Sequence, residues 1–349
     1  MYSIKIANKT IGESRPSFII AEAGVNHNNN LSLALKMVDI AVKAKADAIK
    51  FQTFQADEIQ LKDSKKPRYQ NTQKGKSYYN LIKELEPSLE DQNKIFKYCK
   101  KKKILFISTP YDKKSLDFLD KLGVKAFKIS SSDLTNHIFL EQVISKRKPV
   151  LLSTGLSNMK LVKQSVELFE KKKMKTKLVL LQATSDYPTN ESDVNLKVIE
   201  EYKKKFNVLV GYSDHTMSGL PAYGAVVLGA KVFEKHFTVD RKLPGPDQLS
   251  SLEPNELVDW IKNIRLMEKS LGSNKKEITD SERKNITMRK VLIIKLLVKN
   301  SKISNIHLAA MRGNKKGILP TLENIHKIVG KKINCNINYP TQFSWKMIK

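Results

Sequence analysis

The stretch VLVGYSDHTMSGLPAYGAVVLGAKVFEKHFT, residues 208–238, decides the fold of this chain. Two apolar runs, 208–215 and 231–238, flank a helical pattern over residues 220–228, and each run ends in polar residues that include a histidine. Strands joined by a crossover helix lie parallel in one sheet. The stretch therefore predicts one strand–helix–strand unit with polar side chains at the carboxyl ends of its strands.

The same unit recurs along the chain. Eight apolar runs start roughly 20 to 30 residues apart, the length of one strand plus a crossover helix, except for one longer gap that an insertion fills. Helical patterns lie between them, and Asn30 is the expected N-cap of the first. Eight repeats predict an α/β fold, a closed (β/α)8 TIM barrel, with its active site on the rim where the strands end. The runs are 18–23, 48–54, 104–109, 126–131, 150–154, 178–184, 208–215 and 231–238.

Other segments complete the domain organisation. Residues 1–15 read as a hairpin that would plug the bottom of the barrel. Residues 56–88 form an insertion after the second run, which suits a lid or a substrate pocket on the catalytic rim. The predicted domains are a barrel domain over residues 1–272, a polar linker over 273–289, and a small second domain over 290–349.

The amino-acid composition limits which classes of partner are expected for this chain. The 349 residues carry a formal charge of +28, from 63 Lys plus Arg against 35 Asp plus Glu. The lysines are scattered over predicted helix faces with few interleaved aromatics, which is typical of solvated faces, so no nucleic-acid partner is expected. No apolar stretch approaches the roughly 20 residues of a membrane span, and no signal peptide is seen. A cytoplasmic protein with free thiols at Cys99 and Cys335 is expected.

Two histidines end neighbouring strands of the predicted barrel. His215 and His236 follow the seventh and eighth runs. Neutral imidazoles brought together there bind a divalent metal, whereas a hydrogen-bonded pair of rim histidines is the simpler alternative. Spacing does not decide between the two.

Two lysines lie inside otherwise apolar runs. Lys50 and Lys128 need an anion or a carboxylate partner, because burying an unpaired ammonium is costly. Hydroxyl donors end other strands and favour an anion cradle for phosphate or carboxylate. A Schiff-base lysine, as in barrel aldolases, is the alternative. The hydroxyl residues are Thr109, Ser131, Ser153 and Ser213.

A carboxylate ends the first run. Glu22 suits a general acid or base, or a partner for Lys50 on the adjacent strand. Asp214 and Glu234 lie at the same rim without an assigned role. The chain has no Walker motif, Rossmann fingerprint, zinc-finger spacing or nucleophile elbow, which argues against nucleotide and serine-hydrolase chemistry.

The polar strand ends resemble those of the sialic acid synthase family of bacterial nonulosonate synthases. Nine segments match in family order and cover the barrel from end to end. They are IIAEAGVNHN from Ile19, IKFQTF from Ile49, FISTPYD from Phe106, FKISSSDLTN from Phe127, LLSTG from Leu151, YPT from Tyr187, GYSDHT from Gly211, EKHFTVD from Glu234 and GPD from Gly245. The terminal domain is similar to the antifreeze-like (SAF) domain of these enzymes.

The resemblance implies a condensation of phosphoenolpyruvate with an N-acetylated hexosamine to give a nine-carbon 2-keto acid and phosphate. A divalent metal, Mn²⁺ or Mg²⁺, would be held at His215 and His236, and Glu22 would lie near the reacting carbons. The implied phosphoenolpyruvate residues are Lys50, Thr109, Lys128, Ser131, Ser153 and Ser213, and those on the sugar side are Gln52, Tyr187 and Asp247.

The chain departs from the family pattern at two places. Ser185 stands where the family often has Asn, two residues before Tyr-Pro. The usual Arg-Pro-Gly-x-Gly-Ile loop is replaced by residues 311–318, which keep Arg312 but lose the proline. The resemblance implies that Arg312 reaches the partner's active site in a domain-swapped homodimer and contacts the sugar's N-acetyl group.

The product and two other function classes stay open. N-acetylneuraminate, made from N-acetylmannosamine, is expected, with N,N'-diacetyllegionaminate, made from 2,4-diacetamido-2,4,6-trideoxymannose, as the alternative. A Schiff-base barrel aldolase and a non-enzymatic basic binding protein are the remote hypotheses; the second predicts steep salt dependence.

Overall fold

The computed structural model describes residues 3–67 and 77–349. The chain divides into two compact units, Met1–Gly272 and Ser273–Lys349. No helix in the described part of the chain is both long enough and apolar enough to span a bilayer.

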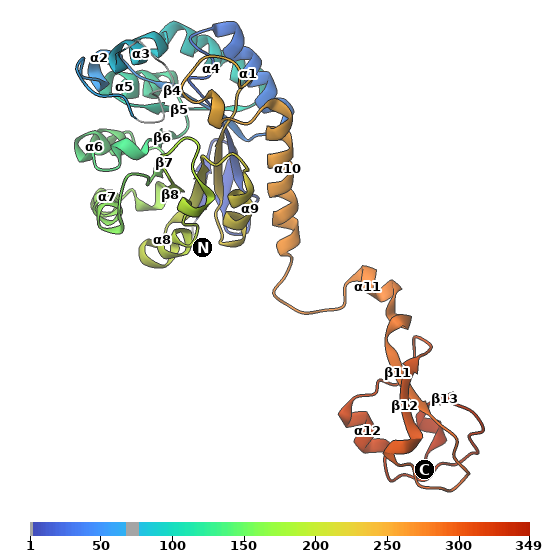
Figure 1. Cartoon of the computed structure of the whole chain (residues 1–349). Coiled ribbons are helices and arrows are strands. Elements are labelled where there is room, and N and C mark those ends of the chain that lie inside the picture. Colours follow the sequence, from blue (N-terminus) through green and yellow to red (C-terminus); the bar gives the residue numbers. More distant parts are fainter. Residues whose placement is uncertain (1–2, 68–76) are drawn as a thin grey trace. The chain divides into compact units, whose positions relative to one another are not determined.

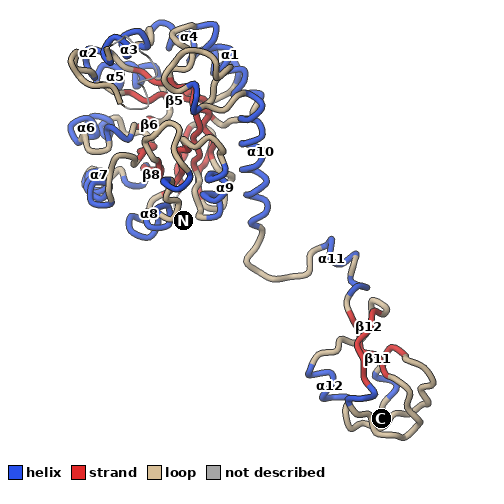
Figure 2. Tube along the Cα trace, viewed as in Figure 1, coloured by secondary structure: helices blue, strands red, loops and turns tan. Residues whose placement is uncertain are grey.

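The first unit is a barrel of eight parallel strands. Their order in the sheet is β5-β4-β3-β10-β9-β8-β7-β6, and β5 packs beside β6 to bring the two ends of the sheet together. Figure 2 shows the strands inside a ring of helices. The strands are β3 (Phe18–Gly24), β4 (Ala48–Thr53), β5 (Leu105–Pro110), β6 (Phe127–Ile129), β7 (Val150–Ser153), β8 (Leu178–Ala183), β9 (Leu209–Asp214) and β10 (Val232–His236). The predicted TIM barrel is confirmed.

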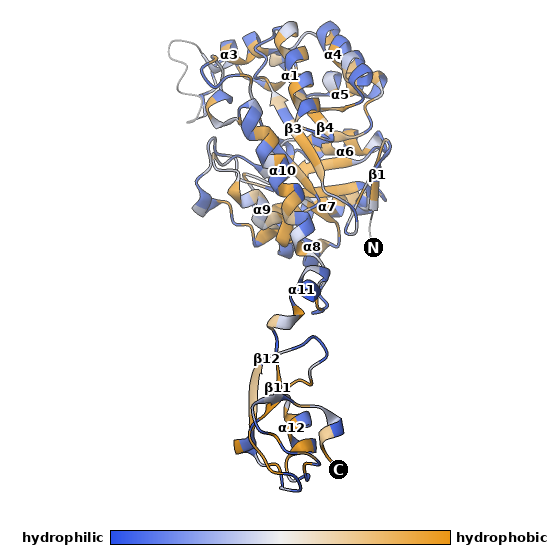
Figure 3. Cartoon of the chain, turned by 90° about the vertical axis from the view of Figure 1, so that its right-hand side faces the viewer, coloured by the Kyte–Doolittle hydropathy of each residue, from blue (hydrophilic) through white to orange (hydrophobic). Residues whose placement is uncertain are grey.

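Helices surround the strands (Figure 1). Their apolar stripes pack on the outward faces of the strands in one continuous core, and Figure 3 shows the apolar strands within more polar helices. Asn30 caps the first helix as predicted, because its side chain accepts a hydrogen bond from the Leu33 amide at 3.0 Å. The helices are α1 (Leu31–Lys43), α4 (Leu89–Lys102), α5 (Lys113–Leu122), α6 (His137–Ser145), α7 (Met159–Lys171), α8 (Val198–Phe206), α9 (Leu220–Val227) and α10 (Pro254–Leu271).

The predicted N-terminal hairpin is present. Strands β1 (Ser3–Ile6) and β2 (Lys9–Gly12) pair antiparallel. Ile4, Ile6 and Ile11 pack with inward side chains of the barrel strands in a second core. The hairpin therefore covers the amino-terminal end of the barrel and leaves the carboxyl-terminal end for the site.

The insertion after β4 contains two short helices, α2 (Ala56–Ile59) and α3 (Tyr78–Leu85). Part of the predicted insertion, residues 68–76, lies outside the described residues. The described part packs on the loops that follow β3 and β4 through a small apolar cluster that includes Val25 and Phe54.

The second unit has its own core around a three-stranded antiparallel sheet of order β12-β11-β13. Its elements are α11 (Asp280–Lys284), β11 (Lys290–Ile294), β12 (Leu308–Arg312), α12 (Leu322–Ile328) and β13 (Thr341–Gln342). Helix α11 lies within the predicted linker. Thr279 and Glu282 form a reciprocal capping box at its start, a Thr-x-x-Glu signal that the sequence carries.

Candidate active site

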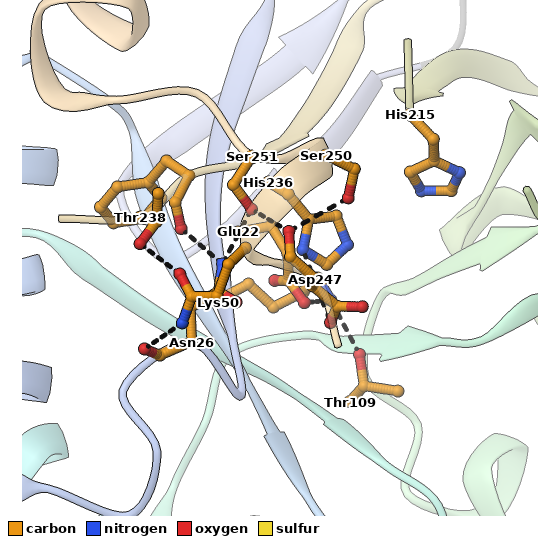
Figure 4. A network of polar contacts seen from close by, with 12 residues as sticks. Glu22, Asn26, Lys50, Thr109, His215, His236, Thr238, Asp247, Ser250 and Ser251 are labelled. Atoms are coloured by element: carbon orange, nitrogen blue, oxygen red, sulfur yellow. Dashed lines mark hydrogen bonds and ion pairs between the residues drawn. The ribbon is translucent and has the colours of Figure 1, made fainter. Parts of the chain in front are cut away.

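A cavity of about 670 Å³ opens at the carboxyl ends of the barrel strands. All the site residues predicted on the barrel line it, because each lies in a barrel strand or in the segment that follows one, and the carboxyl ends of the strands face this rim. They are Glu22, Lys50, Gln52, Thr109, Lys128, Ser131, Ser153, Ser185, Tyr187, Ser213, His215, His236 and Asp247. Figure 4 shows part of this polar network.

Glu22 and Lys50 form a buried ion pair on adjacent strands. Their Cα positions pair directly between β3 and β4, and the Lys50 Nζ lies 2.8 Å from Glu22 Oε1. The same ammonium donates to Thr109 Oγ1 at 3.1 Å. The ion pair considered as the alternative for Glu22 is thus present, and it lies inside the cavity.

Glu234 is the central residue to which the sequence analysis gave no role. Its Oε1 lies 3.2 Å from the Lys128 Nζ and 3.7 Å from the Lys50 Nζ, and it accepts a hydrogen bond from Ser213 Oγ at 3.1 Å. The sequence did carry a signal for this position. Side chains two residues apart in a strand point to the same face, so Glu234 lies on the same face of the strand as His236.

Burial and neighbouring charges set the protonation of this cluster. Burial, reinforced by nearby Glu234, raises the pKa of Glu22 to about 7, although Lys50 opposes the shift. Burial also acts to raise the pKa of Glu234, but Lys128 and Lys50 outweigh it and hold that pKa below its usual range.

The pKa values of Lys50 and Lys128 are shifted in opposite directions within this cluster. Burial disfavours the charged form of both, yet Glu22 and Glu234 outweigh it at Lys50 and hold its pKa above the usual value. At Lys128 burial prevails over Glu234, and the pKa is lowered. A raised pKa disfavours Lys50 as a Schiff-base nucleophile.

The two histidines face each other across β9 and β10, with ring centroids 5.7 Å apart. His215 Nδ1 lies 2.6 Å from the Thr184 carbonyl oxygen, so this nitrogen carries the proton and donates, which leaves Nε2 as a lone-pair ligand. Burial lowers the pKa of His215 to about 4. Burial and the neighbouring His215 lower the pKa of His236 as well. Both rings are therefore neutral at pH 7.

These histidines fit a divalent metal. His236 Nδ1 is buried without a hydrogen-bond partner among the described residues, and it lies 4.0 Å from Asp247 Oδ2. The Tyr187 ring packs against His215 with ring centroids 4.2 Å apart and the ring planes tilted by 34°. No three His, Cys, Asp or Glu side chains cluster as a metal site in residues 3–67 and 77–349. Two imidazoles would thus hold the ion and leave other positions to ligands from solution.

The serines gather around one glycine. The Gly155 amide donates to Ser131 Oγ at 2.9 Å, and a Cβ at Gly155 would collide with the hydroxyls of Ser131 and Ser185. The Ser153 hydroxyl lines the cavity and is buried without a partner in the described structure. Ser185, where the family often has Asn, therefore lies inside the predicted cradle.

Several buried polar atoms at the cavity have no partner in the described part of the chain. Buried polar groups in proteins are nearly always hydrogen-bonded, so such a group of exceptions indicates a site that is completed by a ligand. The atoms are Glu22 Oε2, Glu234 Oε2, Ser153 Oγ and His236 Nδ1.

Two other predicted polar residues lie elsewhere. Asp214 forms a fully buried ion pair with Lys235 at 3.3 Å and accepts hydrogen bonds from Thr216, and neither charged residue lines the cavity. Arg312 ends β12 in the second unit, opposite Lys290 of β11. Its role in a partner's active site stays a prediction.

The barrel and its polar mouth place this chain among TIM-barrel enzymes. The profile of the NeuB family matches residues 37–276. An N,N'-diacetyllegionaminic acid synthase of Legionella pneumophila is 40% identical over 353 residues, which cover 98% of this chain and 97% of that protein. Human N-acetylneuraminate-9-phosphate synthase is 34% identical over 327 residues, covering 93% and 90%.

A solved structure agrees with these relatives. The N-acetylneuraminic acid synthetase of Leptospira borgpetersenii superposes with a TM-score of 0.72 and 38% identity, covering 81% of this chain and 95% of that chain. The chain belongs to the NeuB family of sialic acid synthases. It is therefore an enzyme, a transferase that uses phosphoenolpyruvate, and the hypothesis of a non-enzymatic basic binding protein is wrong.

Proposed function

We propose that this protein condenses phosphoenolpyruvate with an N-acetylated amino sugar to give a nonulosonate and phosphate. The observation that carries the proposal is the pair of buried lysines beside unpartnered polar atoms in one cavity. Phosphoenolpyruvate bears both a phosphate and a carboxylate, and ammonium groups with hydroxyl donors suit both. Family membership favours this chemistry over a Schiff-base aldolase.

The chain's own residues have distinct proposed roles. Lys50 and Lys128, with Thr109 and the serines, hold the anionic groups. Carbon 3 of phosphoenolpyruvate attacks the sugar aldehyde, water adds at carbon 2, and the tetrahedral intermediate releases phosphate. Glu22, whose pKa of about 7 lets it hold or accept a proton near neutral pH, suits proton transfer at these carbons.

The proposed cofactor is a divalent metal ion, Mn²⁺ or Mg²⁺, at His215 and His236. When bound, such an ion supplies a Lewis acid for the aldehyde oxygen. The neutral rings and the free Nδ1 of His236 support this assignment. Gln52, Tyr187 and Asp247 are proposed to bind the sugar.

Two amino sugars are candidates. N-acetylmannosamine would give N-acetylneuraminate, and 2,4-diacetamido-2,4,6-trideoxymannose would give N,N'-diacetyllegionaminate. The higher identity to the Legionella relative than to the human one, 40% against 34%, supports the second.

The second unit is proposed to be an antifreeze-like domain. Its small size and separate core support that assignment. In this proposal the protein is a cytoplasmic homodimer in which Arg312 completes the partner's site.

Phosphate release from phosphoenolpyruvate tests the proposed function. Purified protein is given Mn²⁺ with either sugar, with and without a chelator. Release that requires a sugar and stops on chelation supports the synthase and its metal. If folded, metal-loaded protein releases no phosphate with either sugar, the proposed function is wrong.

A further inference from the structure

A chain of buried hydrogen bonds joins two loops at the mouth of the barrel. Asn26 lies in the loop that follows β3, and Asp247 lies in the segment that follows β10. The Asn26 Nδ2 donates to Ser251 Oγ at 2.8 Å and to the carbonyl oxygen of Phe237 at 2.9 Å. The Ser251 Oγ in turn donates to the carbonyl oxygen of Asp247 at 2.6 Å. Figure 4 shows these contacts running from Asn26 to Asp247.

The main chain of Asp247 is held at one point by two hydroxyl groups. Its carbonyl oxygen accepts the bond from Ser251 and a second bond from Ser250 Oγ at 3.1 Å. The side chain of the same residue lines the cavity, where its Oδ2 lies 4.0 Å from His236 Nδ1. The two serines therefore fix the backbone that carries this carboxylate.

Asn26 contacts the segment after β10 at three places. Besides the bonds to Phe237 and Ser251, its carbonyl oxygen accepts a hydrogen bond from Gln248 Nε2 at 3.0 Å. These contacts bracket Asp247 along the chain, and Asn26, Gln248 and Ser251 are all buried. The described residues that line the cavity include Asp247 but neither Asn26 nor Ser251. Asn26 therefore reaches the cavity only through the segment that it holds.

We propose that Asn26 is a positioning residue for sugar binding, which holds the Asp247 carboxylate in place through Ser251. This inference rests on the proposed function, in which Asp247 binds the sugar. Without the Asn26 amide, the Ser251 hydroxyl and the Phe237 carbonyl lose a buried partner, and the segment must shift to satisfy them. A shift of about 1 Å in a group that contacts the substrate is enough to lower turnover up to about 100-fold.

The loss is expected to fall on the sugar rather than on phosphoenolpyruvate. Asn26 and Asp247 follow β3 and β10, which are neighbours in the sheet. Lys128 and Ser131 lie in or after β6, and Ser153 ends β7. In the closed ring of eight strands, β6 and β7 stand opposite β10 and β3. The proposed anion cradle is therefore built on the far side of the barrel mouth.

Substrate-specific measurements on two variants test the inference. In Asn26→Ala we expect kcat/KM for the better of the two candidate sugars to fall about 10-fold. The Kd of phosphoenolpyruvate, measured by calorimetry without sugar, should stay within about 2-fold of the wild-type value, as for independent sites. Ser251→Ala removes the link but keeps the bond from Asn26 to Phe237, so it should show the same pattern with a smaller loss.

A buried serine elsewhere in the barrel domain provides the matched control. The Ser115 hydroxyl donates to Asp112 Oδ2 at 2.6 Å, and both residues are buried and lie outside the described lining of the cavity. Ser115→Ala loses a buried hydrogen bond as Ser251→Ala does, yet it should leave kcat/KM for the sugar unchanged. Thermal unfolding verifies that each variant is folded.

A double-variant cycle tests whether Asn26 acts through Asp247. Asp247→Asn removes the charge itself and should lower kcat/KM for the sugar more than Asn26→Ala does. Adding Asn26→Ala to Asp247→Asn should then lower it little further, whereas independent effects would multiply. Hydrogen exchange supplies a readout that needs no turnover: the amides of residues 239–252 should exchange faster in Asn26→Ala than in the wild type.

The outcomes separate this inference from the proposed function. Sugar turnover that Asn26→Ala leaves unchanged, an equal loss of phosphoenolpyruvate binding, or effects that multiply in the double variant would each overturn the inference and leave the synthase proposal standing. Unchanged exchange of residues 239–252 would overturn it as well. If the wild type releases no phosphate with either sugar, the proposed function is wrong and the assignment to sugar binding falls with it, while the exchange result still decides whether Asn26 holds the segment.

Discussion

Glu234 Oε1 lies 3.2 Å from the Lys128 Nζ, and both side chains are buried at the barrel mouth. The same oxygen lies 3.7 Å from the Lys50 Nζ. One carboxylate therefore stands between two ammonium groups that would otherwise repel each other. This arrangement fixes the positions of both lysines before a substrate arrives.

Removing this charge is expected to harm both stability and turnover. Glu234→Gln removes the carboxylate that contacts both lysines and leaves Glu22 as the ion-pair partner of Lys50. Breaking a buried ion pair at one partner costs roughly 3 kcal/mol or more. We expect urea unfolding to show a loss of about that size and kcat/KM for phosphoenolpyruvate to fall at least about 10-fold, in line with losing one well-placed charged contact. The exposed Glu200→Gln variant is the control, and matching behaviour of the two variants would contradict the assigned role.

Phosphoenolpyruvate binding is expected to depend on the absence of a side chain at Gly155, because the hydroxyls of Ser131 and Ser185 occupy that space. In Gly155→Ala the new methyl group displaces the hydroxyls of Ser131 and Ser185. We expect KM for phosphoenolpyruvate to rise about 10-fold, the effect of misplacing one or two hydrogen bonds to a charged group. Adding Ser185→Gly relieves the collision with Ser185 and should recover part of the affinity. An unchanged KM in the single variant would show that these hydroxyls do not bind this substrate.

His27 is expected to weaken the fold at acid pH. Burial lowers the pKa of His27 from 6.5 to about 4, so the unfolded chain binds this proton more tightly. The contribution is absent above pH 6.5 and grows into a destabilisation of about 3 kcal/mol as the pH falls to 4. The free energy of unfolding of His27→Gln should therefore depend less steeply on pH over this range than that of the wild type. Parallel curves would refute the shift, and His137→Gln in the same unit is the control.

Cys99 is expected to resist alkylation in the folded protein. Burial raises the pKa of its thiol to about 12, and the side chain is fully buried between α4 and the barrel. The reactive thiolate is therefore nearly absent at pH 8. Mass spectrometry after iodoacetamide treatment should find Cys335, which is half-buried, modified first. Both thiols should react in urea, and rapid native labelling of Cys99 would contradict its burial.

The sequence was sufficient to place most of the site, because a barrel brings every carboxyl strand end to one rim. Lys50 and Lys128 inside apolar runs, and His215 at the end of another, were located from the sequence, and the structure gathers all three side chains in one cavity. The role of Glu234 was missed, since its importance depends on distances across three strands that spacing does not reveal. The positions of Ile59 and Ile82 at the cavity were out of reach for the same reason, because nothing in the local sequence predicts that these side chains line it.

The formation of a carbon–carbon bond is the central claim, and it is tested most directly with phosphoenolpyruvate labelled with ¹³C at all three carbons. The protein is incubated with this substrate, Mn²⁺ and 2,4-diacetamido-2,4,6-trideoxymannose or N-acetylmannosamine, and the products are analysed by mass spectrometry. We predict a nine-carbon 2-keto acid that carries all three labels, together with one phosphate per product. Labelled pyruvate with unchanged sugar would show hydrolysis without condensation and would contradict the account.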